Sequence, residues 1–346
     1  MRRAAVGLVL LAVLGLGVFS LTGIWAVKRF EAPGPLKEQT TVIVPPGSGL
    51  GEIARVLADK GAIESRRLFV AGVTVFGRDR PIKAGEYAIA ANLSPRGVME
   101  LLQSGKTVIR KLTIAEGLSS PQVMAEIAAA EGLEGTTPAP PPEGTMLPET
   151  YHYSYGDSRS EMTARMTKAM DETLAMLWAH RQANLPIAAP EQALILASIV
   201  EKETGRAEER PHVAAVFLNR LKRGMRLQSD PTAVYALTKG ARALGRALTR
   251  EDLETKSPYN TYVADGLPPG PIANPGAESI LAVTQPAWSD DLYFVADGTG
   301  GHVFARTLEE HNRNVAKWRK TRGRQEKAGD ASRLSPSAGN GAKQIP

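Results

Sequence analysis

The chain of 346 residues contains no cysteine. Disulfide bonds, thiolate catalysis and cysteine-ligated zinc are therefore excluded, and the protein must be held together by packing. Metal-ligand spacing is also missing, since the sequence has no His-Glu-x-x-His pattern. The five histidines are scattered at positions 152, 180, 212, 302 and 311. We therefore expect no metal and no cofactor.

Charge is absent from residues 4–27, an apolar run that follows Met1-Arg2-Arg3. The run exceeds the roughly 20 residues needed to cross a bilayer. Because positive residues stay on the cytoplasmic side, we expect residues 1–3 to be a cytoplasmic tail and residues 4–27 a single transmembrane anchor. The rest is then expected outside the inner (plasma) membrane. A cleaved signal peptide is the alternative, but the run is longer than a typical h-region of about 7–15 residues, and no convincing cleavage site follows it.

The chain is long enough for two compact domains besides the anchor. After a linker at residues 28–39, strand-like and helical patterns alternate, which predicts a small α+β module over residues 40–105. Residues 106–144 are expected to connect this module to the next domain. Their Pro-, Gly- and Thr-rich part, residues 132–144, is the candidate mobile junction.

Long helical patterns characterise the following domain, residues 145–318. They occupy about 159–183, 190–204 and 211–223, with polar and aromatic residues between them. The predicted fold class is therefore α+β, with a mixed helical and β domain after the small module. Residues 319–346 have few large apolar side chains and are expected to be disordered.

The helix expected at residues 190–204 carries two carboxylates among apolar residues near its end. Pro190 suits its first position, and Gly205 suits the position after its end. At about 100° per residue, Glu201 and Glu203 point to different faces, so this helix supplies only one carboxyl to a given site. Burial among apolar neighbours raises the pKa of a carboxyl and suits it to act as a general acid. In the alternative, both acids are structural and pair with basic residues such as Arg206, Arg210 or Arg220.

Five motifs follow one another in the order seen in one known family. They are Leu147-Pro-Glu-Thr-Tyr151, Ala197-Ser-Ile-Val-Glu-Lys-Glu-Thr204, Phe217-Leu-Asn-Arg-Leu221 with Leu227-Gln-Ser-Asp-Pro-Thr232, Ser257-Pro-Tyr-Asn-Thr-Tyr262, and Gly266-Leu-Pro-Pro-Gly-Pro-Ile272. With these motifs, from the apolar run to about Lys317, the chain resembles the MltG/YceG-like endolytic murein transglycosylases of bacteria.

The resemblance implies a LysM-like module at residues 40–105 and a catalytic domain that cuts glycan strands internally. Family members cleave the β-1,4 bond between N-acetylmuramic acid (MurNAc) and N-acetylglucosamine (GlcNAc) and leave a 1,6-anhydro-MurNAc end. They are thought to trim nascent strands and so to terminate glycan elongation. The catalytic glutamate of the family maps onto Glu201. In such a lytic reaction the C6 hydroxyl of the sugar takes the place of water, so one acid suffices.

Polar and aromatic residues in the second half of the chain are the expected sugar contacts, because an oxocarbenium-like transition state needs its rings held. They are Gln228, Ser229, Asp230, Thr232, Tyr259, Asn260 and Thr261. Helix capping by Ser229 or Asp230 and a well-packed turn at 259–262 are the alternatives. Three further residues are expected to support the site without reacting, namely Glu203, Arg220 and Glu149. Glu203 would orient Arg220 or the following loop, and Glu149 is equally open as an ion-pair partner.

Two other functions stay open beside a membrane-bound lyase. A non-catalytic peptidoglycan-binding or division scaffold would bind through residues 40–105. A water-using muramidase would need a second facing carboxylate, such as that of Asp230. The formal net charge of +6 comes without a nucleic-acid motif, so an anionic polymer or lipid surface is the expected partner and nucleic acid is not. The expected partners are thus peptidoglycan glycan strands and the membrane, with peptidoglycan synthases or division proteins as further candidates.

Overall fold

The computed structural model describes residues 2–334. The chain forms two compact units. The amino-terminal unit contains the residues up to Leu112 together with 128–136 and 151–161, and the carboxy-terminal unit contains 113–127, 137–150 and the residues from Met162 onward. Both units combine helices with two-stranded sheets, so the predicted α+β class is confirmed. The predicted domain boundaries near residues 105 and 144 do not coincide with this division and remain predictions.

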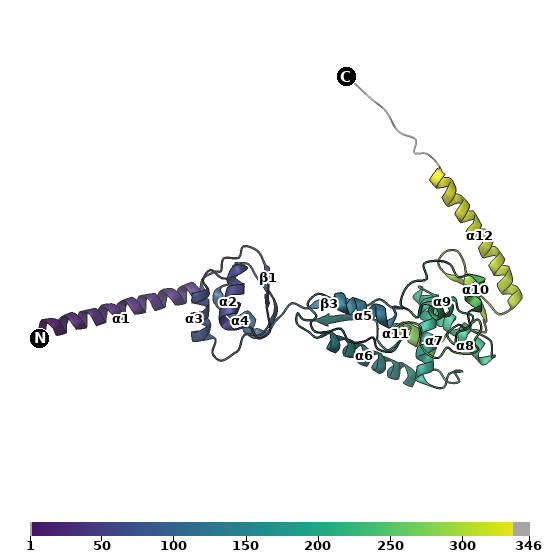
Figure 1. Ribbon diagram of the computed structural model, residues 1–346, viewed down its shortest axis with the longest axis horizontal. Coiled ribbons are helices and arrows are strands. Elements are labelled where there is room, and N and C mark those ends of the chain that lie inside the picture. The colour runs from purple at the N-terminus through teal and green to yellow at the C-terminus, as the bar shows by residue number, and fades with distance from the viewer. Residues whose placement is uncertain (1, 335–346) are drawn as a thin grey trace, which may run out of the picture. The chain divides into compact units, whose positions relative to one another are not determined.

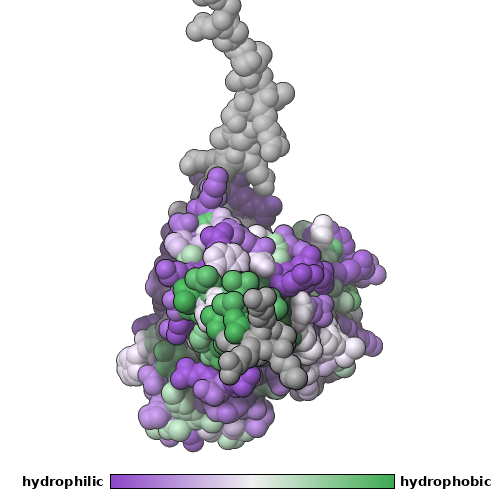
Figure 2. Space-filling model, turned by 90° about the vertical axis from the view of Figure 1, so that its left-hand side faces the viewer, coloured by the Kyte–Doolittle hydropathy of each residue, from purple (hydrophilic) through white to green (hydrophobic). Residues whose placement is uncertain are grey.

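Helix α1 (Arg2–Glu31) is one unbroken helix, longer than the predicted span of 4–27 (Figure 1). No proline interrupts the chain before Pro33, which explains why the first residues of the predicted linker are helical. Among the described residues, this is the one helix long and apolar enough to cross a membrane, over Val13–Glu31, where 6% of the segment is buried. Its exposed apolar side chains gather into the hydrophobic surface seen in Figure 2. A signal sequence meets the same criterion, so the anchor stays a proposal.

The amino-terminal unit is built on an antiparallel pair, β1 (Thr40–Val44) and β2 (Gly85–Ile89), in which Thr40 lies opposite Ile89. The helices of this unit are α2 (Leu50–Asp59), α3 (Arg66–Phe76) and α4 (Pro95–Ser104). Ser65 and Ser94 cap α3 and α4 through their side chains, as N-cap serines do. The core consists of fully buried side chains, among them Val42, Leu57, Phe69, Tyr87 and Leu102. Local sequence therefore sets both the helix starts and the buried faces of this unit.

Further elements follow in chain order. They are β3 (Arg110–Thr113), which pairs with β4 (Thr150–Tyr153), and the helices α5 (Ser120–Ala129) and α6 (Arg159–Ala179). Next come α7 (Pro190–Glu203), a 3-10 turn (Ala207–Glu209), α8 (Arg210–Lys222), α9 (Asp230–Thr238), α10 (Arg250–Glu254) and α11 (Ala277–Thr284). The hairpin of β5 (Tyr293–Ala296) and β6 (His302–Ala305) then leads to α12 (Leu308–Leu334).

Helix α7 is the central element of the carboxy-terminal unit, packed against α8, α9 and α11. Its side chains at Leu196, Ala197, Ile199 and Val200 are completely buried. The helix expected at 190–204 is thus confirmed, with Pro190 at its start. Both glutamates near its end are partly buried, whereas Lys202 between them is exposed.

Part of the tail that the sequence predicted to be disordered is helical. Helix α12 continues through residues 319–334, where the sequence predicted a disordered tail. This segment is rich in Lys, Arg, Gln, Glu and Ala, which favour helix on propensity alone even without an apolar face to bury. The remainder of the predicted tail, residues 335–346, lies outside the described residues.

Candidate active site

Glu201 is held by three hydrogen-bond donors. Its Oε1 accepts from Arg210 Nη2 at 3.1 Å, and its Oε2 accepts from the backbone N–H of Gly276 at 2.9 Å and from Ser279 Oγ at 2.8 Å. Gly276 is the N-cap of α11, so the carboxylate also faces the positive end of that helix. These contacts, and the ion pair with Arg210 in particular, match the structural alternative that the sequence left open for this acid.

The carboxyl of Glu203 lies in surroundings that differ from those of Glu201. Protein atoms surround its carboxyl, and this desolvation raises the pKa of Glu203 to about 7. Ser229 Oγ donates a hydrogen bond to Glu203 Oε1 at 2.5 Å, which lowers the pKa of Glu203. The nearby charge of Asp230 raises this pKa, and the charge of Arg220 lowers it. No ion pair with Glu203 occurs among the described residues. A carboxyl of this kind can hold a proton near neutral pH, as a general acid must.

Glu203 lines a cavity of about 420 Å³, a volume within the range usual for small-ligand sites. Its lining includes Arg220, Gln228, Asp230, Tyr262, His302 and His311 besides Glu203. Burial and the nearby guanidinium of Arg220 lower the pKa of His311. Tyr262 donates its hydroxyl proton to Asp230 Oδ1 at 2.5 Å, which fixes both groups at the cavity wall. Glu201 does not line this cavity.

The predicted sugar contacts divide into two groups. Gln228 and Asp230 line the cavity, and Ser229 contacts the acid itself. Thr232, Asn260 and Thr261 are completely buried instead and bind the chain. For these three residues the structure differs from the prediction, because a side chain without exposed surface cannot reach a sugar.

The buried residues of this set join two loop segments, 227–232 and 259–262. Thr261 Oγ1 accepts the backbone N–H of Ser229 at 3.0 Å and lies 2.8 Å from Thr232 Oγ1. Asn260 donates to the carbonyls of Leu253 and Thr255, and its side-chain oxygen accepts the N–H of Tyr262 at 3.1 Å. The packed-turn alternative therefore describes these residues, and their contribution is to hold Ser229 and Tyr262 in place.

Tyr259, Arg220 and Glu149 differ in their positions relative to the cavity of Glu203. Tyr259 packs against Tyr235 with ring centroids 4.9 Å apart and is not part of the cavity lining. Arg220 donates to the carbonyls of Leu292 and Leu227, and its guanidinium lines the same cavity as Glu203. Glu149 is exposed and lines neither this cavity nor the cavity beside α9, which differs from its predicted place beside the acid.

Sequence reasoning did not single out several residues of the site. Tyr262 lies in one of the five motifs but is not among the predicted sugar contacts, and the scattered spacing of His302 and His311 gives no signal of their place in the lining. Within residues 2–334, no group of three or more His, Cys, Asp or Glu side chains is arranged to hold a metal ion. The contact of Glu201 with Ser279 joins residues 78 positions apart in the sequence, and no local pattern signals it.

An enclosed, protonatable carboxyl in a polar cavity of an α+β domain defines a candidate acid catalyst. Comparison with known proteins then shows that the chain belongs to the YceG-like family, whose model matches residues 42–317. A relative named "Endolytic murein transglycosylase" from Bacillus subtilis is 31% identical over 82% of this chain and 85% of its own length. A protein of the same name from Streptococcus pneumoniae is 30% identical over 81% of this chain, which spans 58% of that longer relative. A crystal structure of a YceG-like protein from Listeria monocytogenes shares 33% identity, covers 80% of this chain and 99% of its own, and gives a TM-score of 0.49.

Proposed function

We propose that this protein is an endolytic murein transglycosylase, a lyase that cuts peptidoglycan glycan strands internally. Family membership and relatives of that name support the activity. The observation that carries the chemistry is Glu203, a carboxyl whose pKa is raised to about 7 by burial and which faces a polar cavity. The bond proposed to be cut is the β-1,4 link between MurNAc and GlcNAc in nascent strands, and the product would carry a 1,6-anhydro-MurNAc end.

Glu203 is the proposed general acid, in place of Glu201. In the first step, the Glu203 carboxyl gives its proton to the glycosidic oxygen while the bond from that oxygen to C1 of MurNAc breaks. In the second, the Glu203 carboxylate takes the proton of the C6 hydroxyl while O6 bonds to C1. The acid is thereby regenerated and no water is consumed. Glu201 is less suited to this role, because it does not line the cavity and its two carboxyl oxygens are already bound by Arg210 and two further donors.

A water-using muramidase is the second candidate, and Asp230 is the observation that favours it. This carboxylate lines the same cavity as Glu203, so two acids face one space. Its Oδ1 accepts a hydrogen bond from the Tyr262 hydroxyl. In the proposed lytic reaction Asp230 stabilises the positive charge that develops at C1. In the hydrolytic alternative it activates a water.

The proposal also covers the domain organisation and the location of the protein. Residues 40–105 would form the LysM-like module, and residues 145–318 the catalytic domain, joined by residues 106–144. Helix α1 would anchor the chain in the inner membrane with residues 1–3 in the cytoplasm, so that the site acts outside the membrane where new strands emerge. The long exposed apolar face of α1 supports this arrangement. Peptidoglycan synthases and division proteins are the proposed partners at that location.

One digestion experiment tests these functions together. The purified chain is incubated with peptidoglycan strands, and the new chain ends are determined by mass spectrometry. Anhydro-ended fragments, lighter by one water than hydrolytic fragments, are the expected product. Reducing ends would establish the muramidase, and binding without any product would establish the scaffold.

Two matched variants identify the acid. Glu203→Gln is expected to lose activity by at least about 100-fold, as removal of a general acid does, while keeping its fold. Glu201→Gln is expected to keep product formation in the folded protein. A folded but inactive Glu201→Gln, together with an active Glu203→Gln, would return the catalytic role to Glu201.

A further inference from the structure

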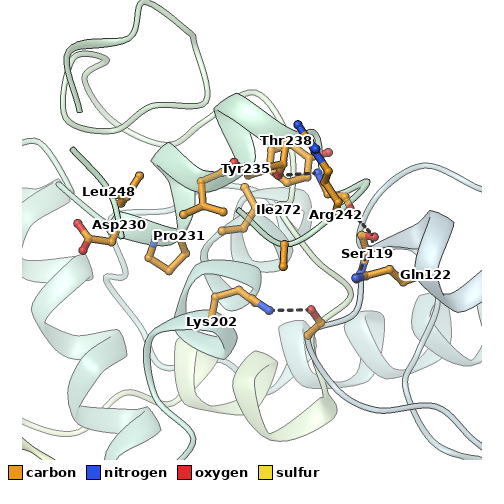
Figure 3. A pocket seen from close by; sticks show the side chains of 14 residues that line it. Ser119, Gln122, Lys202, Asp230, Pro231, Tyr235, Thr238, Arg242, Leu248 and Ile272 are labelled. Atoms are coloured by element: carbon orange, nitrogen blue, oxygen red, sulfur yellow. Dashed lines mark hydrogen bonds between the residues drawn. The ribbon is translucent and has the colours of Figure 1, made fainter. Parts of the chain in front are cut away.

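A second cavity, of about 430 Å³, lies beside α9 (Figure 3). It is bounded by Lys202 at the end of α7, by one side of α9 and by the loop that follows α9. In Figure 3, Asp230 and Leu248 lie toward one end of it and Ser119, Gln122 and Arg242 toward the other, with Lys202 and Ile272 between them. Neither Glu201 nor Glu203 lines this cavity, so acid catalysis does not account for it.

Two cations face the cavity with unused donors. Arg242 is exposed and has no ion pair or hydrogen bond within residues 2–334. Lys202 gives one hydrogen bond, to the carbonyl of Gly117 at 3.1 Å, and an ammonium group has three donors. The acids nearby are already occupied, because Asp230 accepts from Tyr262, and Glu143 accepts from the N–H of Ser120 and lies 3.5 Å from the Tyr235 hydroxyl. Neither cation has an ion-pair partner among the described residues, so both keep donors for the carboxylates of a ligand.

The rest of the lining is mainly apolar or carries neutral hydrogen-bonding groups. Pro231, Val234, Leu248 and Ile272 provide apolar surface. Ser119, Gln122 and Thr238 provide hydroxyl and amide groups at the edges. Apolar walls with a few placed charges suit a small ligand that combines methyl groups with carboxylates. A short acidic peptide has that chemistry.

The position of the cavity identifies the peptide. Asp230 lines both this cavity and the cavity of Glu203, so the two are adjacent. The bond proposed to be cut starts at C1 of MurNAc, and the stem peptide of peptidoglycan is attached through the lactyl group of that same sugar. A peptide on the reacting MurNAc must therefore leave the active site within one sugar ring of the cleaved bond.

We propose that the cavity beside α9 binds the stem peptide of the reacting MurNAc, with Arg242 and Lys202 binding its carboxylates. This inference rests on the proposed function, because it takes peptidoglycan as the substrate. It makes peptide-bearing strands the preferred substrate over bare glycan. Arg242 and Lys202 are binding residues and take no part in bond cleavage.

The first test compares two substrates, peptide-bearing strands and the same strands stripped of peptides by an amidase. Arg242→Gln and Lys202→Gln are each expected to lower kcat/KM on peptide-bearing strands by about tenfold, the effect of one lost charged hydrogen bond. On stripped strands they are expected to match the wild type. Arg223→Gln, an exposed arginine that lines neither cavity, is the control and is expected to change neither rate. An equal loss on both substrates, or no loss on either, would overturn the proposal.

The second test measures binding alone and separates this proposal from the proposed function. The detergent-solubilised full chain carrying Glu203→Gln is titrated with each strand preparation. Tighter binding of the peptide-bearing strands, lost in the double variant with Arg242→Gln, supports the peptide site even if the wild type cuts neither substrate. Equal affinity for the two preparations refutes the peptide site even if cleavage is observed.

Discussion

At the scale of single residues, the site depends on two carboxyls two positions apart on one helix that have opposite surroundings. Glu201 is 5% exposed in its side chain and lies against a guanidinium, a hydroxyl and the N-terminus of α11. Glu203 is the last residue of α7, accepts a hydrogen bond from the Ser229 hydroxyl and lies near the acid Asp230. Arg210 and two further donors bind the first carboxyl, whereas desolvation raises the pKa of the second to about 7. The protein thereby gives two identical side chains different surroundings.

Glu201→Gln is expected to weaken the fold. The amide removes the charge that faces Arg210 and turns one acceptor into a donor, which leaves Arg210 with Glu116 as its remaining ion-pair partner among the described residues. The expected loss is about 2 kcal/mol of unfolding free energy, measured by urea denaturation. Glu208→Gln is the control, since Glu208 is exposed and 3.8 Å from Arg206, and no change is expected there. An unaffected Glu201→Gln variant would contradict the structural role.

The raised pKa of Glu203 predicts a pH-dependent stability. The carboxyl ionises near 4.5 in the unfolded chain and near 7 in the folded chain, so the folded state binds more protons between these values. The contribution of Glu203 to stability is therefore present below about pH 4.5 and is lost as the pH rises to 7. Because glutamine does not titrate, Glu203→Gln is expected to gain on the wild type between pH 4 and pH 8, by up to about 3 kcal/mol. Unfolding curves at both pH values measure this, and parallel curves for the two proteins would argue against an enclosed carboxyl.

At the scale of elements, the cavity wall depends on the interlock of the two loops at 227–232 and 259–262. Thr261→Val keeps the shape of the side chain but leaves the buried N–H of Ser229 without its acceptor. The expected loss is about 1–3 kcal/mol of stability, with slower product formation because Ser229 no longer holds Glu203. Urea denaturation and anhydro-end release measure the two effects. Thr113→Val, an exposed threonine on β3, is the control that is expected to leave both unchanged.

Elements with strong local signals could be predicted from the sequence. Pro190 and Gly205 bracket α7 to within two residues, and the helical phase that separates Glu201 from Glu203 is confirmed by their distinct partners. The environment of each acid could be predicted only in part. The sequence offers Arg210 as a partner without indicating which acid it binds, and Ser229 and Ser279 meet α7 only in the folded chain. The same holds for Thr232, Asn260 and Thr261, whose polar pattern is identical for a sugar platform and for a packed turn. Only burial distinguishes the two.

At the scale of the whole molecule, α1 is continuous with the folded amino-terminal unit. Phe30, near its carboxy-terminal end, is 1% exposed and lies against Phe69 and Phe76, with ring centroids 6.4 and 5.9 Å apart. Upstream, Phe19 and Leu21 are 78% and 69% exposed. One helix thus has an end fixed in a protein core and a long apolar part without protein partners. This exposed apolar surface supports the proposal that α1 lies in a bilayer.

Deletions at the two ends of the chain test the proposed membrane anchor. Deleting residues 2–27 is expected to release the protein from the membrane fraction into the soluble fraction, since it removes the apolar surface and keeps Phe30 in the core. Deleting residues 335–346 is the control and is expected to leave membrane association unchanged. Amino-terminal sequencing of the membrane-bound protein distinguishes a retained anchor, which begins before residue 4, from a cleaved signal, which begins after residue 27. A protein that begins after residue 27, or one that stays in the membrane fraction without residues 2–27, would show that α1 does not anchor the mature chain.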